Sequence, residues 1–533
     1  MKKHLLLLST AALLCLNSCS NKHAGVVAPE SNPNGDKVYY EIFVRAFADS
    51  DGDGIGDLNG ITENLDYLTE LGVGGLWLMP IATSPSYHGY DVTNYKEVDP
   101  DYGTIEDFER LTSEAKKRGI DVITDFVINH SSNQHPWFLD AMSSPDAKYR
   151  DYYKFLPQAD IERMCLAGEV PMVDDKIYEE KKWKEPKIDT TDKDYKYFSH
   201  FGPGMPDLEH GVVPDLNPVY YEIVDAAKFW MEHGAAGLRL DAVRHLYQDS
   251  LGVENVRLLE RFYNDVNDAY PGTYMVGEVF SISEEVAPFF GGLPTVFSFD
   301  SWWKLENALI GRTEPKSYAE EMERLNKKLE NVSKTYNSGT KLTNHDESRA
   351  ISLLGESVDK AKIAAMALLT MPGQPYVYYG EELGMGNLKG VGRGDEYVRE
   401  PLLWGNEYTT SWKENTAPTA TVKEQLADEN SMLNFYKTVI GIRNATPALQ
   451  RGAFTPVPSK ELPAALMAWS RSLGFSEVYT LMNASEEEIN YTIDINLTNA
   501  KELFKKGDAK FIADGEKTIL TLPAYSILLI EKL

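Results

Sequence analysis

The chain has 533 residues, of which 43% are hydrophobic, and its formal net charge at pH 7 is −28. This length exceeds one simple core and is enough for two or three domains. The negative charge argues against nucleic acid as a partner, because a protein must neutralise phosphates with Lys and Arg. A soluble protein that acts on a neutral ligand fits this composition.

The N-terminus has the pattern of a secretory signal peptide. Lys2 and Lys3 form a short positive region, and the apolar run 5–14 that follows is too short to span a bilayer. The run ends in the sequence LNSC at 16–19, which resembles a bacterial lipobox. We therefore expect a lipoprotein signal peptide over 1–18 and a lipid on Cys19. An ordinary signal peptide with an incidental cysteine is the alternative.

Two further expectations follow from the lipobox. Residues 19–36 are polar and rich in Asn, Pro and Gly, which is typical of a flexible tether. Of the three cysteines, only Cys165 would remain as a free thiol after cleavage and acylation, so an intrachain disulfide is not expected.

Short apolar runs that end in polar clusters predict eight strands. They are 38–43, 75–79, 121–127, 237–240, 274–279, 295–299, 341–344 and 375–379. Helical patterns lie between most of these runs, at 62–71, 105–118, 220–233, 317–334 and 360–370. Alternating strands and helices imply a parallel sheet, and eight repeats fit a closed (β/α)₈ TIM barrel.

Two regions depart from this rhythm. The polar and aromatic segment 131–213 is too long for a structureless loop and predicts an inserted domain after strand three. After a helical stretch at 431–444, alternating apolar segments predict a C-terminal antiparallel β-sandwich over 451–533. The α/β barrel itself would then comprise 37–130 and 214–450.

Three carboxylates, those of Asp241, Glu278 and Asp346, lie at the ends of predicted strands four, five and seven. The active site of such a barrel lies at the carboxyl ends of its strands. A helix cap or an ion pair would explain any one of these groups alone, because a carboxylate beside an apolar strand is costly unless it is paired or functional. Three at matching strand ends favour an active site.

Arg239 and Asp241 are two residues apart on a strand, so their side chains share one face. A guanidinium beside Asp241 would favour its ionised form, as a nucleophile needs. Burial beside an apolar strand would raise the pKa of Glu278 and keep it protonated as an acid. Two such carboxyls fit glycoside hydrolysis, which retains anomeric configuration if they lie about 5–5.5 Å apart.

An acidic loop at 49–57 spaces its oxygen ligands as a calcium-binding loop does at its start. Position twelve is Gly60 instead of the bidentate Glu of an EF-hand, so the loop is not an EF-hand. A hard cation is expected here, and a solvated acidic turn is the alternative. The ligands would be Asp49, Asp51, Asp53 and Asp57, together with the backbone carbonyl of Ile55.

Four segments resemble, in sequence, order and spacing, the conserved regions of the α-amylase family, glycoside hydrolase family 13. They are 125–130 (DFVINH), 237–245 (GLRLDAVRH), 275–279 (MVGEV) and 342–346 (LTNHD). The lipobox and the segments 49–57, 376–383 and 394–399 point further to the outer-membrane α-amylases of gut-bacterial starch-utilisation systems. The segment 131–213 is too short for the starch-binding module inserted in such enzymes.

The resemblance implies roles for individual residues. Asp241 would be the nucleophile, Glu278 the general acid/base, and Asp346 would stabilise the oxocarbenium-like transition state. Tyr90 would stack on the sugar in the cleaved subsite, with Asp91 and Arg349 supporting the pocket. The remaining substrate contacts would come from His88, His130 and His345 at that sugar, and from Asp395 and Arg399 at the next one. Satisfied polar packing is the alternative for the histidines, and a core position is the alternative for Tyr90.

The resemblance also implies metals. In oligosaccharide-cleaving members of the family the 49–57 loop holds Ca²⁺ or Mg²⁺, and amylases typically carry a second, structural Ca²⁺. The ligands of that second ion would be Asn129, Asp207 and the backbone carbonyl of His245. Asp215 is the alternative to Asp207.

The residues around the nucleophile favour endo-acting cleavage of α-1,4 bonds in starch and maltooligosaccharides. Relatives that cleave α-1,6 bonds usually carry Val where this chain has Ala242, and they lack the pair Arg244-His245, which would contact sugars beyond the cleavage point. A neopullulanase-like, α-1,6-cleaving or transglycosylating enzyme is the alternative, and a non-catalytic glycan-binding protein is another. The expected location is the cell surface, anchored to the outer membrane beside other starch-utilisation proteins, with the periplasmic face as an alternative.

Overall fold

The computed structural model describes residues 36–167, 183–184, 195–247, 252–333, 336–390 and 394–533. The predicted signal peptide, nearly all of the predicted tether and Cys19 lie outside these ranges. Within them, no helix has both the length and the apolar character needed to cross a bilayer.

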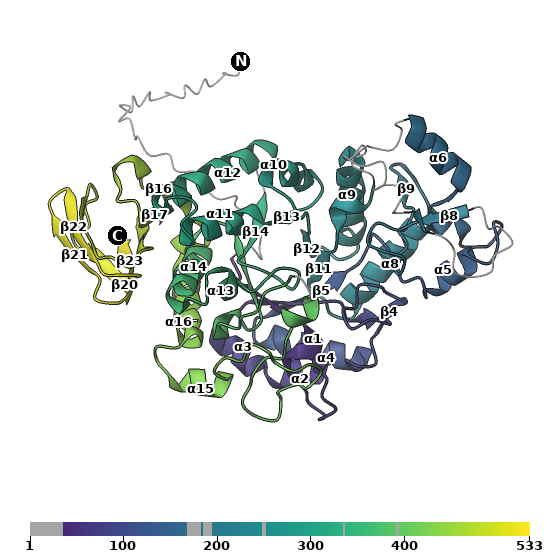
Figure 1. Cartoon of the computed structure of the whole chain (residues 1–533), viewed down its shortest axis with the longest axis horizontal. Helices are drawn as coiled ribbons and strands as arrows, with labels where there is room; N and C mark the ends of the chain where they lie inside the picture. Colours follow the sequence, from purple (N-terminus) through teal and green to yellow (C-terminus); the bar gives the residue numbers. More distant parts are fainter. Residues whose placement is uncertain (1–35, 168–182, 185–194, 248–251, 334–335, 391–393) are drawn as a thin grey trace, which may run out of the picture.

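Eight parallel strands close into a barrel, which confirms the predicted (β/α)₈ fold (Figure 1). In chain order they are β1 (Tyr39–Ile42), β2 (Gly75–Leu78), β5 (Asp121–Phe126), β11 (Gly237–Leu240), β12 (Tyr274–Gly277), β13 (Thr295–Ser298), β14 (Asn337–Lys341) and β15 (Gln374–Tyr378). Each strand pairs with the next one in this order, and β15 pairs with β1. Aromatic rings, including those of Tyr39, Trp77 and Phe297, fill the interior of the barrel.

The seventh strand lies earlier than the predicted range 341–344, because β14 is Asn337–Lys341. Its residues are small or polar, so the sequence pattern resembles a turn more than a strand. Inside the barrel the small size is required, since a Cβ on Gly339 would lie 2.9 Å from a ring carbon of Phe297. Ser338 and Thr340, on the opposite face of the strand, are buried as well.

Amphipathic helices surround the barrel and bury one face against it. The longer ones are α4 (Ile105–Lys117), α8 (Pro218–Glu232), α9 (Gly252–Asn267), α11 (Asp300–Leu309), α12 (Tyr318–Val332), α14 (Val358–Thr370) and α16 (Met432–Ala445). The predicted helix 62–71 is divided at Asn64 into α2 (Leu58–Glu63) and α3 (Leu65–Leu71). Neither α9 nor α11 was predicted.

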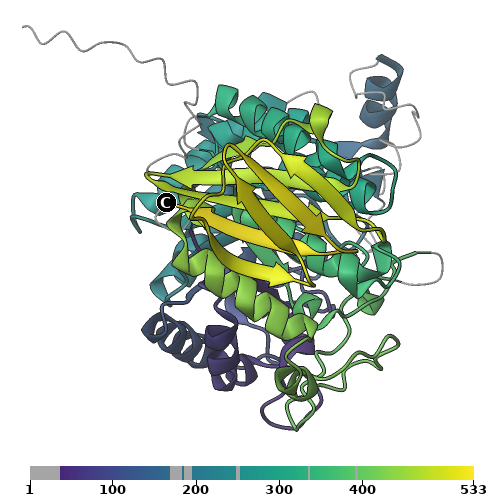
Figure 2. The same ribbon diagram turned by 90° about the vertical axis from the view of Figure 1, so that its left-hand side faces the viewer.

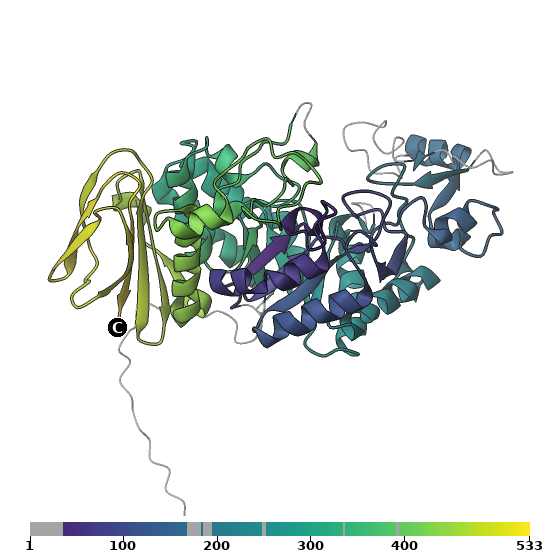
Figure 3. The same ribbon diagram turned by 90° about the horizontal axis from the view of Figure 1, so that it is seen from below.

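The segment between β5 and β11 forms a separate projection at one end of the molecule (Figures 1 and 3). It contains α5 (Pro136–Ala141), α6 (Gln158–Ala167) and a small antiparallel sheet in the order β6-β8-β7. The strands of that sheet are β6 (Phe155–Pro157), β7 (Trp183–Lys184) and β8 (Tyr195–Phe198). A two-stranded hairpin of β9 (Gly211–Val212) and β10 (Asp215–Leu216) leads back to the barrel.

The C-terminal region consists of two antiparallel sheets at the opposite end of the molecule (Figure 2). The larger sheet has the order β16-β17-β18-β23-β20, with bounds Ala453–Pro456, Leu466–Leu473, Ser476–Asn483, Ile527–Lys532 and Lys501–Lys506. The smaller sheet has the order β19-β22-β21, with bounds Ile489–Ile493, Lys517–Leu522 and Lys510–Asp514. Leu466, Leu481 and Leu520 belong to the apolar cluster between the sheets, as expected for a β-sandwich.

Candidate active site

The buried guanidinium of Arg239, on β11, contacts three carboxylates at the carboxyl end of the barrel. Its Nη1 donates hydrogen bonds to Oδ1 of Asp125 at 2.8 Å and to Oδ1 of Asp241 at 2.7 Å. Its Nη2 lies 2.9 Å from Oε2 of Glu278. Because β5, β11 and β12 are neighbours in the barrel, these side chains converge at their ends. The structure thus brings together two of the three predicted catalytic carboxylates.

Burial controls the protonation of these carboxylates. It raises the pKa of Asp125 to about 7 and also raises the pKa values of Asp241 and Glu278, although Arg239 opposes each shift. The sequence pattern pairs the guanidinium with Asp241 alone, whereas in the structure both Asp241 and Glu278 contact it. The negative charge of Asp241 raises the pKa of Glu278 further.

Asp346, the third predicted catalytic carboxylate, follows β14 and has a partly exposed side chain. Nη2 of Arg399 donates to its Oδ1 at 2.9 Å, and Nε2 of His345 lies 3.1 Å from its Oδ2. Burial disfavours the charged form, but His345 and Arg399 outweigh it and hold the pKa of Asp346 well below its ordinary value. Asp346 is therefore an anion beside the other two carboxylates.

His345 is fully buried between two carboxylates. Its Nδ1 lies 2.5 Å from Oε1 of Glu41 on β1, on the other side of the ring from Asp346. Burial lowers the pKa of His345, but Asp346 and Glu41 outweigh this and raise it to about 9. His345 is therefore protonated at neutral pH.

Sequence reasoning missed Glu41 and Asp125. Glu41 is 1% exposed, and a single Glu within an apolar strand was the only signal that could have revealed it. Asp125 is the first residue of the DFVINH segment, but no role in the site was predicted for it. Besides Arg239, it accepts hydrogen bonds from the hydroxyl of Tyr90 at 3.0 Å and from Nε1 of Trp77 at 3.2 Å.

The ring of Tyr90 lies between two histidine rings. The centroid distances are 6.1 Å to His88 and 5.5 Å to His345. Asp91 accepts hydrogen bonds from Ser84 and Ser86 and so holds this loop. His88 and Tyr90 thus lie in the same cluster of side chains as His345.

His130 is buried, and burial lowers its pKa to about 4, so the ring is neutral at pH 7. Its Nδ1 faces the side-chain amide of Asn129 at 3.3 Å, which leaves the hydrogen on Nε2. Among the described residues, that nitrogen has no hydrogen-bond partner. The Tyr90 backbone lies close enough to raise the pKa of the ring, so His130 offers a donor beside Tyr90.

The remaining residues that were predicted to contact the substrate differ in exposure and in their partners. Arg399 is buried and holds Asp346, whereas Asp395 is partly exposed and pairs with Lys389 at 2.6 Å. Arg244 forms an ion pair with Glu285 at 2.7 Å. The His245 ring packs on that of His200, with centroids 4.0 Å apart.

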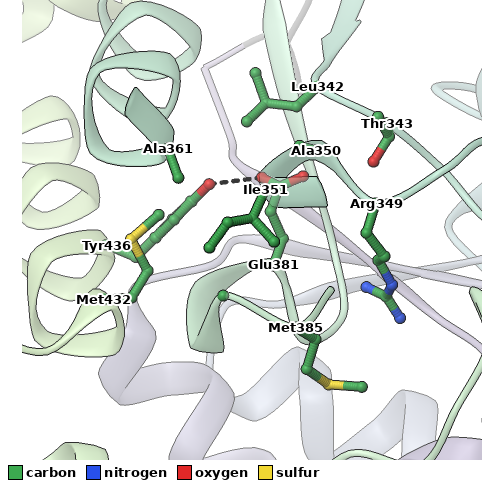
Figure 4. A pocket seen from close by; sticks show the side chains of 11 residues that line it. Leu342, Thr343, Arg349, Ala350, Ile351, Ala361, Glu381, Met385, Met432 and Tyr436 are labelled. Carbon is green, nitrogen blue, oxygen red and sulfur yellow. Dashed lines mark hydrogen bonds between the residues drawn. The ribbon is translucent and has the colours of Figure 1, made fainter. Parts of the chain in front are cut away.

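Arg349 lines a cavity of about 10 Å³, enough for one water molecule (Figure 4). Its Nη1 donates to the carbonyl of Tyr379 at 2.5 Å. Glu381 lines the same cavity and accepts a hydrogen bond from Tyr436 at 2.7 Å. Burial raises the pKa of Glu381 to about 8. Arg349 thus holds the backbone that follows β15.

The acidic loop places carboxylate oxygens of Asp49, Asp51 and Asp57 within 4.8 Å of one another. Asp53 lies outside this group, and its Oδ1 accepts a hydrogen bond from the backbone N–H of Ile55 at 2.7 Å. Gly54 adopts a φ of 96°, a left-handed conformation that allows the tight turn. Three of the four predicted carboxylate ligands are thus close enough to share a cation.

At the second predicted metal site, the buried Oδ1 of Asn129 has no hydrogen-bond partner among the described residues. Asp207 lies next to it, because the backbone N–H of Leu208 donates to the carbonyl of Asn129 at 2.9 Å. Asp215, the alternative ligand, is exposed on β10. An orphaned acceptor beside a buried carboxylate is a donor set that fits Ca²⁺.

The contact between Glu41 and His345 predicts a pH dependence of stability. Because the pKa of His345 is raised from 6.5 to about 9, its contribution is complete below pH 6.5 and is lost as the pH rises through 9. Glu41→Gln should lower that folded-state pKa, so the fall in melting temperature from pH 6.5 to 9 should become smaller. Glu516→Gln, at an exposed hairpin position, is the control. An unchanged fall in the Glu41 variant would contradict the assignment.

Comparisons with known proteins agree with this geometry. The family model for the α-amylase catalytic domain matches residues 41–452. The α-amylase SusG of Bacteroides thetaiotaomicron is 35% identical over 78% of this chain and 79% of its own length. Alpha-amylase 3 of Dictyoglomus thermophilum is 34% identical over 93% of each chain.

A solved structure and a more distant relative extend these comparisons. The crystal structure of an α-amylase from H. orenii is 34% identical and superimposes with a TM-score of 0.80 over 93% of this chain and 99% of that one. An oligo-1,6-glucosidase of Bacillus cereus is 27% identical over 93% of this chain and 98% of its own length. The family match and the barrel confirm the resemblance found in the sequence: the chain belongs to the α-amylase family and is a glycoside hydrolase.

Proposed function

We propose that this protein is a retaining, endo-acting α-amylase that hydrolyses α-1,4-glucosidic bonds in starch and maltooligosaccharides. The observation that carries the proposal is the single guanidinium of Arg239, which contacts Asp241 at 2.7 Å and Glu278 at 2.9 Å. Two carboxyls held by one guanidinium have the short separation that suits a covalent intermediate. The two α-amylases that are 34–35% identical to this chain support the substrate class.

In the first step, the carboxylate of Asp241 attacks the anomeric carbon while Glu278 protonates the glycosidic oxygen of the leaving chain. Burial and the negative charge of Asp241 raise the pKa of Glu278, which favours the protonated form that a general acid needs. The product is a glycosyl ester on Asp241.

In the second step, Glu278 takes a proton from the water that cleaves the ester. Ester formation removes the negative charge of Asp241, which is one of the causes of the raised Glu278 pKa. The pKa of Glu278 therefore falls when the intermediate forms, and the same residue becomes a base.

Asp346, held ionised by His345 and Arg399, would stabilise the positive charge that develops on the sugar ring. The Nε2–H of His130 would donate to a hydroxyl of that sugar. His88 and Tyr90 would complete the subsite, with Asp395 at the adjacent sugar.

The choice of α-1,4 over α-1,6 bonds depends on the residue after the nucleophile. Ala242 has a φ of 51°, a left-handed conformation in which a β-branched residue such as Val would be strained. Its backbone N–H donates to Oε2 of Glu278 at 3.2 Å. Because one relative is an oligo-1,6-glucosidase, cleavage of α-1,6 bonds is the second candidate function.

Product analysis on amylose, pullulan and panose tests the bond specificity. We expect rapid cleavage of amylose to a mixture of maltooligosaccharides and slow attack on pullulan and panose. Release of panose from pullulan together with poor cleavage of amylose would contradict the α-amylase assignment. Products longer than the supplied oligosaccharide would indicate transglycosylation.

We also propose two structural cation sites. Asp49, Asp51 and Asp57 would hold Ca²⁺ or Mg²⁺, supported by their mutual approach to within 4.8 Å, with Asp53 and the Ile55 carbonyl as further ligands. Asn129, Asp207 and the carbonyl of His245 would hold Ca²⁺, supported by the orphaned Oδ1 of Asn129. The reaction needs only carboxylates, so both ions would act on stability.

Chelation should therefore lower the melting temperature, and added Ca²⁺ should restore it. Asp51→Asn should reduce the size of this chelator-dependent shift, because it removes one exposed ligand of the acidic loop. Asp514→Asn, on β21 far from both sites in sequence, is the matched control. A melting temperature that chelators leave unchanged would count against both sites.

The lipobox supports a further proposal about location. Acylation of Cys19 would anchor the enzyme to the outer membrane by its N-terminus, on the cell surface, where it could act beside other starch-utilisation proteins. This anchor is independent of the chemistry at Asp241 and Glu278.

A further inference from the structure

A cavity of about 310 Å³ opens where the start of the inserted segment meets the barrel. Its walls come from β4 (Asn94–Val98), from the start of α5 and from the outer face of α8. This volume lies at the lower end of the range for small-ligand sites. None of its lining residues belongs to the candidate active site or to the proposed cation sites.

One wall of the cavity is an aromatic platform. The partly exposed indole of Trp137 stacks on the buried ring of Tyr95, with centroids 5.9 Å apart and planes at 22°. The imidazole of His135 lies 4.2 Å from the indole, and Tyr152 meets it edge-on at 5.3 Å. These contacts fix the indole in one orientation. Within the described part of the chain, its Nε1–H makes no hydrogen bond.

A second donor comes from His135, which is only 4% exposed. Burial lowers the pKa of His135 to about 4, so the ring is neutral at pH 7. Its Nδ1 accepts a hydrogen bond from the backbone N–H of Trp137 at 3.1 Å, which leaves the hydrogen on Nε2. That nitrogen makes no hydrogen bond to any residue that the structure describes. Because His135 lines the cavity, this nitrogen can donate to a molecule bound there.

The rim of the cavity carries both hydrogen-bond acceptors and donors. Glu222, on the exposed side of α8, has no ion-pair partner among the described residues. Asn94 and Lys96, on β4, also line the cavity, and Lys96 pairs with Asp225. Because Asp225 pairs with Lys96 and Glu222 adds a negative charge, the rim has no net positive charge, which disfavours a phosphate or another anionic ligand. A neutral ligand rich in hydroxyl groups fits this rim, because each hydroxyl both donates and accepts.

We propose that this cavity is an accessory binding site for an α-glucan chain, with one sugar ring against Trp137. Its hydroxyls would accept from His135 and from the indole Nε1–H, and donate to Glu222. The choice of an α-glucan over other sugars rests on the proposed function. Tyr95 separates this cavity from the candidate active site, since its hydroxyl donates to the carbonyl of His130 at 2.7 Å. The accessory site therefore binds the chain without cleaving it.

Calorimetric titration of maltoheptaose into the full chain carrying Asp241→Asn tests the inference without cleavage of the ligand. We expect two classes of site, one of which is lost on adding Trp137→Ala. Adding Glu222→Ala should weaken that class by about tenfold, because a hydrogen bond to a charged group is removed. Glu222 is exposed and makes no hydrogen bond or ion pair with another described residue, so this variant keeps the test decisive even if Trp137→Ala fails to fold. Glu232→Ala, exposed on the same helix, is the matched control and should change nothing.

A single class of site in the parent chain, or two classes that persist in both the Trp137 and Glu222 variants, would overturn the accessory site. The wild-type enzyme separates this failure from that of the proposed function. If it still releases maltooligosaccharides from amylose, only the accessory site is refuted. If it does not cleave amylose, the proposed function fails independently of the titration.

Discussion

The structure depends on one buried positive charge. The Arg239 guanidinium has no contact with solvent, and an unpaired charge in such a place would strongly destabilise the fold. Closure of the barrel solves this problem, because β5, β11 and β12 become neighbours and bring Asp125, Asp241 and Glu278 to the same guanidinium. The pairing that stabilises the barrel interior is thus the pairing that assembles the candidate catalytic groups.

A second set of charges extends from this centre. His345 is held protonated by Glu41 and Asp346, and Arg399 holds Asp346 from the other side. Positive and negative groups therefore alternate from Glu41 on β1 to the exposed edge of Asp346. Asp346 is the only member of this second set with an appreciably exposed side chain. Its fixed negative charge would therefore face the place where a positively charged transition state forms.

Much of the fold and site could be predicted from the sequence, because apolar runs that end in polar motifs mark barrel strands and the groups at their ends. Strand seven was misplaced, since the interior beside Phe297 requires the small residue Gly339, which lacks any strand pattern. Glu41 was missed because its burial follows from barrel closure and its partner is 304 residues away in sequence. The contact of Arg239 with both Asp241 and Glu278 was missed for the same reason, because it depends on the pairing of β11 with β12 in the closed barrel. The cavity at Trp137 is lined by three segments that are far apart in sequence, so no local sequence pattern predicts it.

The turnover of Asp241→Asn on amylose tests the central claim most directly, with the melting temperature as a check on folding. The amide keeps the size of the side chain and its contact with Arg239 but cannot form the glycosyl ester. We predict a fall in kcat of about four orders of magnitude or more with the fold preserved. A folded variant that keeps a substantial fraction of the wild-type rate would contradict the assignment of Asp241 as the nucleophile held by Arg239.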